Sequence, residues 1–185
     1  MNVSGTLNVF RLLWNPRLCM PQLTVPTFND LPLPINSNIK AVVLDKDNCF
    51  AYPKDDKVWP TYLEKWQSLK QQYPGKKLLI VSNTAGSSDD LDYEQAKKLE
   101  AVTGVSVLRH AVKKPGCKDE IMQYFVENKV ANSPSEVAVV GDRLFTDIIM
   151  ANSMGAYGVW IKDGVEDSTN PISKFEKSLY NYLKF

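Results

Sequence analysis

The stretch AVVLDKDNCF, residues 41–50, decides the fold class of this chain. Its apolar run, Ala41 to Leu44, has the pattern of a strand buried on both faces, and it leads directly into two aspartates, Asp45 and Asp47. Like charges at the end of a buried strand repel each other, and removing them from water costs free energy. We therefore expect either a solvated turn here or a positive group that the two carboxylates face.

The length and composition of the chain are those of one globular domain with room for an appended segment: 185 residues, 44% hydrophobic and 23% charged. The 22 basic residues nearly cancel the 21 acidic ones, so there is no basic surplus of the kind that a nucleic-acid partner requires. No stretch is long and apolar enough to span a bilayer, and no secretory signal is recognised. The three cysteines are odd in number and lack metal-ligand spacing, which indicates reduced thiols in an intracellular compartment.

Residues 1–38 are predicted to form a membrane-associating segment and a proline-rich arm, followed by one domain over residues 39–185. Five of the 11 prolines lie in the first 39 residues, and this density favours an extended path over helix. The apolar residues before the arm have helical spacing: Val3, Leu7, Phe10, Leu13 and Trp14. This pattern fits an interfacial anchor, part of a mitochondrial address, or a helix that packs on its own domain. Arg11 and Arg17 are too few for a convincing transit peptide.

From residue 39 onward, short apolar runs alternate with helical patterns. The predicted strands are 40–44, 77–81, 105–108, 136–140 and 156–161, and the predicted helices are 60–72, 90–102, 117–129, 143–153 and 171–183. Alternation of buried strands with helices indicates a parallel sheet covered on both faces. The sequence therefore predicts an α/β fold, a doubly wound parallel sheet with five core strands.

Polar side chains follow four of these strands, at the ends where such a sheet holds its reactive groups. They are Asp45 and Asp47 after the first strand, Ser82, Asn83 and Thr84 after the second, Lys113 and Lys114 after the third, and Asp142 and Asp147 after the fourth. One of these groups alone is explained as a turn or a helix cap. Four groups that converge on one edge are not.

This set of residues has a chemical logic. Clustered carboxylates without histidine or thiol partners suit Mg²⁺, which leaves coordination positions for water and phosphate. Mg²⁺ and Lys114 would neutralise a phosphate dianion that the aspartates alone would repel. Asp45 is ionised at neutral pH and can attack phosphorus, while the nearby charge favours a raised pKa at Asp47, so that this carboxyl can protonate a leaving alkoxide.

The motifs VVLDKDNCF, the strand-ending Ser82, Lys114 before a proline, and GDRLFTD resemble the four motifs of the haloacid dehalogenase (HAD) superfamily of phosphohydrolases, over residues 39–165. More closely, AVVLDKDN, LLIVSNTAGS, VLRHAVKKPGC and VAVVGDRLFTDI resemble the fungal-type mitochondrial phosphatidylglycerophosphatases, with a similar N-terminal arm. The resemblance implies removal of the terminal phosphate of phosphatidylglycerophosphate on the route to cardiolipin. It also implies peripheral attachment to the matrix face of the mitochondrial inner membrane.

The resemblance assigns roles to the matching residues. It implies that Asp45 is the nucleophile and a Mg²⁺ ligand, and that Asp47 is the general acid/base and also binds the metal through its backbone carbonyl. It implies that Ser82, with Asn83 sharing the role, binds the phosphate and that Lys114 stabilises it. Asp142 would be a Mg²⁺ ligand, and Asp147 would orient the site from behind the ligands. One departure is Asn48-Cys49, where many relatives have threonine and an aliphatic residue. We interpret Cys49 as a core residue and His110, the single histidine, as structural.

The spacing of the motifs leaves no room for a cap domain. Asp47 and Ser82 are 35 residues apart, and Thr84 and Lys114 are 30 apart, which a helix, a strand and their loops use up. An uncapped site admits bulky substrates: a phospholipid headgroup in a membrane or, as the alternative, a phosphoprotein. Four basic residues predicted near this edge are candidates for binding a second phosphate or an anionic membrane surface: Arg109, Lys113, Lys118 and Arg143. Weak single anchors gain from multivalency, so we also expect a homo-oligomer.

Two rival functions use similar residues. A signalling receiver domain also combines acids, a hydroxyl and a lysine, but it accepts phosphate on its third strand, and here the run 105–108 ends in Arg109-His110. A non-catalytic scaffold of the same superfamily is disfavoured because every motif residue is present.

Overall fold

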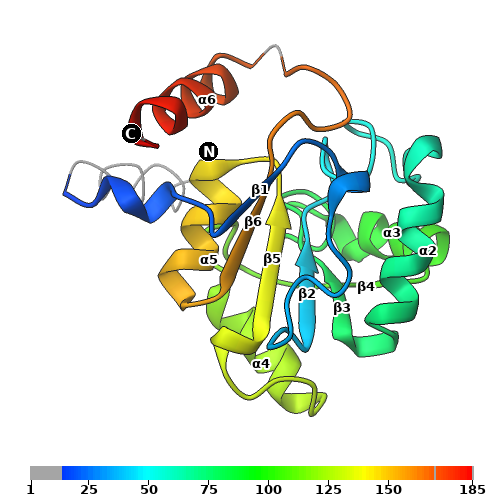
Figure 1. Cartoon of the computed structure of the whole chain (residues 1–185). Coiled ribbons are helices and arrows are strands. Elements are labelled where there is room, and N and C mark those ends of the chain that lie inside the picture. The colour runs from blue at the N-terminus through cyan, green and yellow to red at the C-terminus, as the bar shows by residue number, and fades with distance from the viewer. Residues whose placement is uncertain (1–13, 169, 185) are drawn as a thin grey trace.

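One sheet of six parallel strands forms the centre of the molecule, with strand order β1-β6-β5-β2-β3-β4 (Figure 1). This computed structural model describes residues 14–168 and 170–184. The strands are β1 (Leu23–Val25), β2 (Ala41–Leu44), β3 (Leu78–Ile80), β4 (Ser106–Val107), β5 (Val137–Gly141) and β6 (Tyr157–Ile161). The strand order reverses between β2 and β5, and ligands of open α/β sheets bind at such a switch point. The predicted α/β fold with a parallel sheet is confirmed.

Helices cover both faces of this sheet. The α-helices are α2 (Leu63–Gln72), α3 (Glu94–Thr103), α4 (Lys118–Glu127), α5 (Ile149–Met154) and α6 (Pro171–Leu183). Short 3₁₀ helices are η1 (Pro16–Cys19), η2 (Phe28–Asp30), η3 (Pro60–Tyr62), η4 (Gly75–Lys77), η5 (Leu91–Tyr93) and η6 (Pro134–Glu136), and η7 (Leu144–Ile148) is a π-helix. Within the described part of the chain, no helix combines the length and the apolar character that crossing a bilayer requires.

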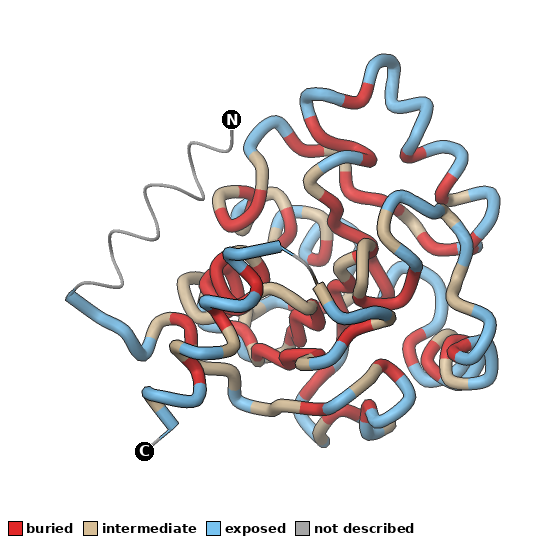
Figure 2. Tube along the Cα trace, turned by 90° about the horizontal axis from the view of Figure 1, so that it is seen from above, coloured by how far each residue is buried: buried red, intermediate tan, exposed pale blue. Residues whose placement is uncertain are grey.

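The continuous apolar pattern of β2 arises because each face of the sheet has its own core. Val42 and Leu44 pack with α2 and α3, whereas Ala41 and Val43 pack with α4 and α5. Successive side chains of a strand point to opposite faces, so a strand covered on both sides must be apolar at every position. Figure 2 shows the buried chain running through the middle of the molecule with exposed chain around it.

The sheet has one strand more than the five predicted. β1 comes from the proline-rich arm and pairs with β6 at the edge of the sheet. The three residues of β1 lie within the four that separate Pro21 from Pro26, a run too short to be recognised as a strand, and an edge strand tolerates proline at its ends. The arm also adds Phe28, Leu31 and Ile35 to the core of one face. The predicted division of the chain at residue 39 stays a prediction, and residues 1–13, which carry most of the predicted anchor, lie outside the described residues.

The predicted helix over residues 143–153 is correct in place but begins with a different geometry. Asp147 N and Ile148 N both donate to Arg143 O, at 3.0 and 3.3 Å, which opens the first turn into the π-helix η7 before α5. Apolar spacing cannot distinguish a π turn from an α turn, and such turns are frequent at functional sites.

Candidate active site

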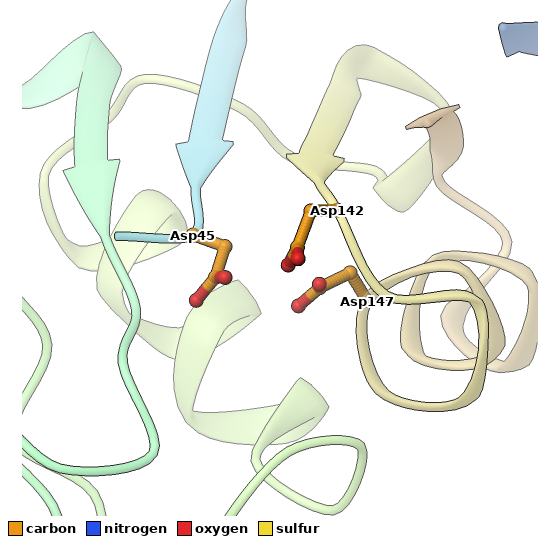
Figure 3. Close-up of side chains that lie close together, drawn as sticks. All are labelled: Asp45, Asp142 and Asp147. Carbon is orange, nitrogen blue, oxygen red and sulfur yellow. The ribbon is translucent and has the colours of Figure 1, made fainter. Parts of the chain in front are cut away.

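Three carboxylates meet beyond the carboxyl ends of β2 and β5. Asp45 follows β2, Asp142 follows β5, and Asp147 lies in η7. Each offers an oxygen, and these oxygens lie within 4.8 Å of one another (Figure 3). The parallel register that sets Leu44 beside Val140 brings the first two together, because it aligns the strand ends. Asp45 N extends this pairing by donating to Val140 O at 2.9 Å.

Asp147 reaches the other two carboxylates because the end of β5 is a glycine. A Cβ atom at Gly141 would lie 2.3 Å from Asp147 Oδ2, so a larger residue would displace the carboxylate. The same oxygen accepts a hydrogen bond from Arg143 N at 3.1 Å. Asp147 is 1% exposed and held from two sides. Its position is therefore set by the backbone between Gly141 and η7.

Lys114 is the positive group that Asp45 faces. Its Nζ donates to Asp45 Oδ1 and, at 2.7 Å, to Asp147 Oδ1. Its backbone N donates to Asn83 Oδ1 at 2.7 Å, which ties the lysine loop to the segment that follows β3. The side chain is 3% exposed. Of the two alternatives expected for the end of β2, a solvated turn or a positive group, this arrangement agrees with the second for Asp45.

The electrostatics of the cluster favour neutral acids. Burial, the main cause, together with the charges of Asp147 and Asp47 raises the pKa of Asp45 to about 6, although Lys114 opposes the shift. Burial and the charges of Asp45 and Asp147 raise the pKa of Asp142 well above its ordinary value. Burial alone would lower the pKa of Lys114, but the two carboxylates that it contacts outweigh burial and raise it. The site therefore holds more negative charge than its own residues neutralise.

The donor set fits Mg²⁺. The group consists of carboxylate oxygens, which are hard donors, and among the described residues it contains neither histidine nor cysteine. A dication would balance the charge that Lys114 leaves uncompensated. Asp147 belongs to this group together with Asp45 and Asp142, although its predicted role is to orient the metal ligands from behind. The carboxylate of Asp47 is not in the group.

The carboxylate of Asp47 contacts a second lysine that the sequence interpretation left without a role. Asp47 Oδ1 accepts from Lys46 Nζ at 2.8 Å and from Lys54 N at 2.7 Å. Lys46 is 3% exposed, and its Nζ also donates to Asp55 O at 2.7 Å. Burial of a lysine between two aspartates becomes visible only once the loop over residues 54–55 is placed, because that loop supplies the contacts with Asp47 and Lys46.

A cavity of about 260 Å³ opens over the carboxylates. Its lining consists of Asp45, Asp47, Asn48, Pro53, Asn83, Thr84, Lys114, Asp142, Arg143, Thr146, Ser168 and Ser173. Ser82 is not in this lining as far as the described residues go: its hydroxyl is buried, contacts Thr84 Oγ1 at 3.0 Å and accepts from Thr84 N at 3.2 Å. Thr84, Thr146, Ser168 and Ser173 are lining residues to which the sequence interpretation assigned no binding role.

Asn48 joins the site to the loop after β6. Its Nδ2 donates to Asp142 Oδ2 at 3.3 Å, and its Oδ1 accepts from Val165 N and Glu166 N at 3.1 and 3.0 Å. The backbone of Asn48 has φ 59°, a conformation that asparagine tolerates well. The departure from threonine at this position therefore has a structural use.

Three of the four basic residues predicted near this edge form ion pairs with acids: Arg109 with Glu100, Lys113 with Asp89 and Lys118 with Asp119. Their predicted role in binding a phosphate or a membrane stays a prediction. Arg143 alone of the four lines the cavity. Its Nε donates to Glu176 Oε2 of α6 at 2.8 Å.

The contacts of His110 and Cys49 are those of structural residues. His110 contacts Val112 O and Ser82 O with its two ring nitrogens, at 2.8 and 2.9 Å. Cys49 is fully buried in the core of one sheet face, as predicted, and burial raises the pKa of its thiol.

Three clustered carboxylates and a buried lysine, at the switch point of a doubly wound sheet and beneath a polar cavity, make this an α/β protein of the phosphatase type. Comparison with known proteins makes the assignment specific. The sequence pattern of a family described as mitochondrial PGP phosphatase matches residues 3–166. The chain belongs to the mitochondrial PGP phosphatase family.

Two curated relatives agree with this assignment. The chain is 68% identical over 185 residues to "Phosphatidylglycerophosphatase GEP4, mitochondrial" of Saccharomyces cerevisiae, with all of both chains covered. It is 34% identical to "Probable phosphatidylglycerophosphatase, mitochondrial" of Schizosaccharomyces pombe, covering 99% of this chain and 93% of the relative. A crystal structure of an uncharacterized protein from Listeria monocytogenes is 16% identical with a TM-score of 0.48, covering 78% of this chain and 99% of that one.

Proposed function

We propose that this chain hydrolyses the terminal phosphate of phosphatidylglycerophosphate to give phosphatidylglycerol, through an aspartyl-phosphate at Asp45 and with Mg²⁺ as cofactor. The observation that carries the mechanism is the cluster of three carboxylates at the β2–β5 switch point, two of which, Asp45 and Asp147, accept hydrogen bonds from Lys114. The substrate follows from the family and from the names of the two relatives.

In the first step a carboxylate oxygen of Asp45 attacks phosphorus and the bond from phosphorus to the glycerol oxygen breaks. Lys114 holds Asp45 in place and faces the phosphoryl oxygens, whose charge grows as the bonds change. When bound by Asp45, Asp142 and the backbone carbonyl of Asp47, Mg²⁺ would neutralise these carboxylates and polarise the phosphate. Asp147 keeps Lys114 oriented.

Asp47 handles the proton. A glycerol alkoxide is a poor leaving group, so the Asp47 carboxyl gives its proton to the departing oxygen and then takes one from the water that attacks the aspartyl-phosphate. Inorganic phosphate leaves, and Asp45 and Asp47 return to their starting states. The position of Asp47 in the cavity lining supports this role.

The remaining polar groups bind the headgroup. Asn83 and Lys114 line the cavity together with Asp45, and we assign them, with Ser82, to the transferred phosphate. Arg143 is suited to the second phosphate of the substrate, the diester next to the lipid glycerol, because this residue lines the cavity and its Nε is held by Glu176.

The open site fits a substrate that remains in a bilayer. Between Asp47 and Ser82 the chain forms η3, α2, η4 and β3, and this part of the structure contains no inserted cap. The relatives are mitochondrial, and we infer that this chain works as a peripheral protein on the matrix side of the inner membrane, as a homo-oligomer. Light scattering of the purified protein tests the oligomer.

Purified protein tests the proposed function in three assays with and without Mg²⁺: phosphatidylglycerophosphate in detergent, p-nitrophenyl phosphate and a phosphopeptide. We expect Mg²⁺-dependent turnover that is fastest with the lipid. Faster turnover of the phosphopeptide would make the lipid a secondary substrate, and activity unchanged by chelation would exclude the metal.

A further inference from the structure

The last helix, α6, has an apolar surface that the core does not use. Ser173, Glu176 and Tyr180 form its buried side, whereas Ile172 and Phe175 are 52% and 58% exposed and Tyr182 is 80% exposed. Ile172, Phe175 and Tyr182 are three and seven residues apart, so they form a single stripe along one side of the helix, and Leu179, which lies between them, is partly buried against the core. Exposed apolar side chains gathered on one stripe indicate a binding surface more strongly than scattered ones do.

A second exposed aromatic residue lies on the same side of the molecule. Trp14, 84% exposed, comes just before η1, and η1 packs against α6: Cys19 and its neighbours Leu18 and Met20 share a cluster with Leu179, Tyr180 and Leu183. Figure 1 shows η1 and α6 together at one side of the sheet, with α6 beyond the carboxyl ends of the strands. The stripe thus lies at the end of the molecule that holds the active site, while Trp14 lies next to η1, where it lines a cavity with Leu18, Asn152 and Ser153.

The buried side of α6 is part of the active-site wall. Ser173 lines the cavity next to Ile172 of the stripe. Glu176, 1% exposed, accepts from Arg143 Nε and from Phe145 N, both at 2.8 Å. The stripe therefore borders the cavity through a helix that is fixed to Arg143.

The charge around this surface favours an anionic partner. The segments 14–29 and 171–184 carry four basic residues, Arg17, Lys174, Lys177 and Lys184, and their one acid is Glu176, which is buried and paired. Of these four basic residues, Lys177 alone forms ion pairs within the described part of the chain. Its Nζ lies 3.7 Å from Asp163 Oδ1 and 3.8 Å from Asp167 Oδ1.

We propose that the stripe Ile172, Phe175 and Tyr182, together with Trp14, is the surface by which this protein docks on an anionic lipid bilayer. The proposal rests on the proposed function, because a phosphatase of bilayer lipids must present its cavity to the membrane. Tryptophan and tyrosine suit the boundary between water and lipid, since each has an apolar body and a polar group. Insertion of the stripe would place Ser173 and Arg143 at the depth of the headgroups, where the diester of the substrate lies.

The test is flotation of the full chain with vesicles of phosphatidylcholine and cardiolipin, without substrate. The variant is Ile172→Ser with Phe175→Ser and Tyr182→Ser, and the matched control is Leu91→Ser with Val102→Ser and Val126→Ser, residues that are 82%, 48% and 47% exposed on η5, α3 and α4. We expect the bound fraction of the α6 variant to fall about tenfold or more. The control should float like the wild type, and both should keep p-nitrophenyl phosphate hydrolysis.

Phe175 contacts the ring of Phe145 with centroids 6.0 Å apart, so its removal affects packing as well as the surface. If the triple variant loses hydrolysis of the soluble substrate, the pair Ile172→Ser and Tyr182→Ser, which keeps Phe175, decides the question with the same readout. Flotation of the competent variant at the wild-type level overturns the proposal and moves the membrane contact elsewhere, to residues 1–13 for example. Equal flotation combined with loss of an oligomer identifies the stripe as an interface between copies and overturns the proposal too.

The two proposals fail separately. Wild-type protein that floats but does not hydrolyse phosphatidylglycerophosphate contradicts the proposed function and leaves the docking surface in place. Protein that hydrolyses the lipid in detergent but floats independently of the stripe contradicts the docking surface alone.

Discussion

The active site and the outer edge of β4 both contain acids and bases in contact, but their charge balance differs. The active site has more acids than bases, whereas the pair at the edge of β4 is balanced. At the β4 edge, Arg109 and Glu100 form a pair of guanidinium–carboxylate bonds, Glu100 accepts from Val107 N and Arg109 donates to Val107 O. The pair thus covers the free backbone groups of an edge strand, which would otherwise attract another chain. Each charge has a partner.

The pKa directions express the same difference. The bond from Arg109, the main cause, lowers the pKa of Glu100, whereas burial raises the pKa of Asp45 to about 6 at the active site. The cavity beside the β4 edge is even the larger one, about 420 Å³ against 260 Å³. Cavity size therefore does not identify the site. An excess of buried like charge does, because such an excess is tolerated only where a ligand balances it.

The largest effect is expected from a substitution in the active-site cluster itself. Asp45→Asn should reduce turnover of phosphatidylglycerophosphate by about 10⁴-fold or more, because an amide cannot attack phosphorus. Steady-state kinetics and circular dichroism of the same preparation check the rate and the fold. A variant that retains even a tenth of the wild-type rate would remove Asp45 as nucleophile.

Removal of the proton donor should have a smaller effect that depends on the leaving group. Asp47→Asn should lower the rate with phosphatidylglycerophosphate by about 10² to 10⁴, the usual contribution of general acid catalysis. The loss should be smaller with p-nitrophenyl phosphate, whose leaving group needs little protonation. Equal losses on the two substrates would contradict the acid role.

The unbalanced charge also predicts how stability depends on pH and on metal. The pKa of Asp45 is about 6 in the folded protein and 3.8 ordinarily, so the folded state binds its proton more tightly. Without metal, stability should therefore fall as the pH rises from about 4 through about 6, and Asp142 acts in the same direction.

Mg²⁺ binds the ionised carboxylates, so it should raise Tm by about 5–10 °C near pH 7.5 at saturating concentration and by less at pH 5. Thermal scans with Mg²⁺ and with a chelator measure both effects. A metal-induced shift that is larger at pH 5 than at pH 7.5 would show that the cation binds elsewhere.

The smallest effect on activity is expected at the balanced cluster. Glu100→Gln should leave turnover within about twofold of the wild type, because the hydrogen bonds of the Glu100 carboxylate within the described chain go to Val107 and Arg109 at the sheet edge. It should lower the free energy of unfolding by about 1–3 kcal/mol, since Arg109 loses a charged partner. Chemical denaturation and the phosphatase assay together measure the two. Loss of activity without loss of stability would connect the β4 edge to catalysis and end the contrast drawn above.

Most of the fold and the centre of the site could be predicted from the sequence. Apolar runs separated by helical patterns locate five of the six strands, and neighbouring parallel strands align their ends, so Asp45 and Asp142 had to come close together. The contact of Lys114 with Asp45 depends in addition on the path of the loop after β4. β1 escaped prediction because three residues between prolines carry no periodic signal of their own. Its strand character comes from pairing with β6.

What the sequence determines by itself is the order of buried strands and the chemistry at their ends, since both depend on residue type and on spacing along the chain. What only the tertiary structure decides is which charges find partners. Arg109 and Arg143 are the same residue type near predicted strand ends, yet one pairs with Glu100 at the sheet edge and the other is held in the cavity wall by Glu176, 33 residues away on α6. Ion pairs form between groups within a few ångströms, and the folded backbone alone sets those distances.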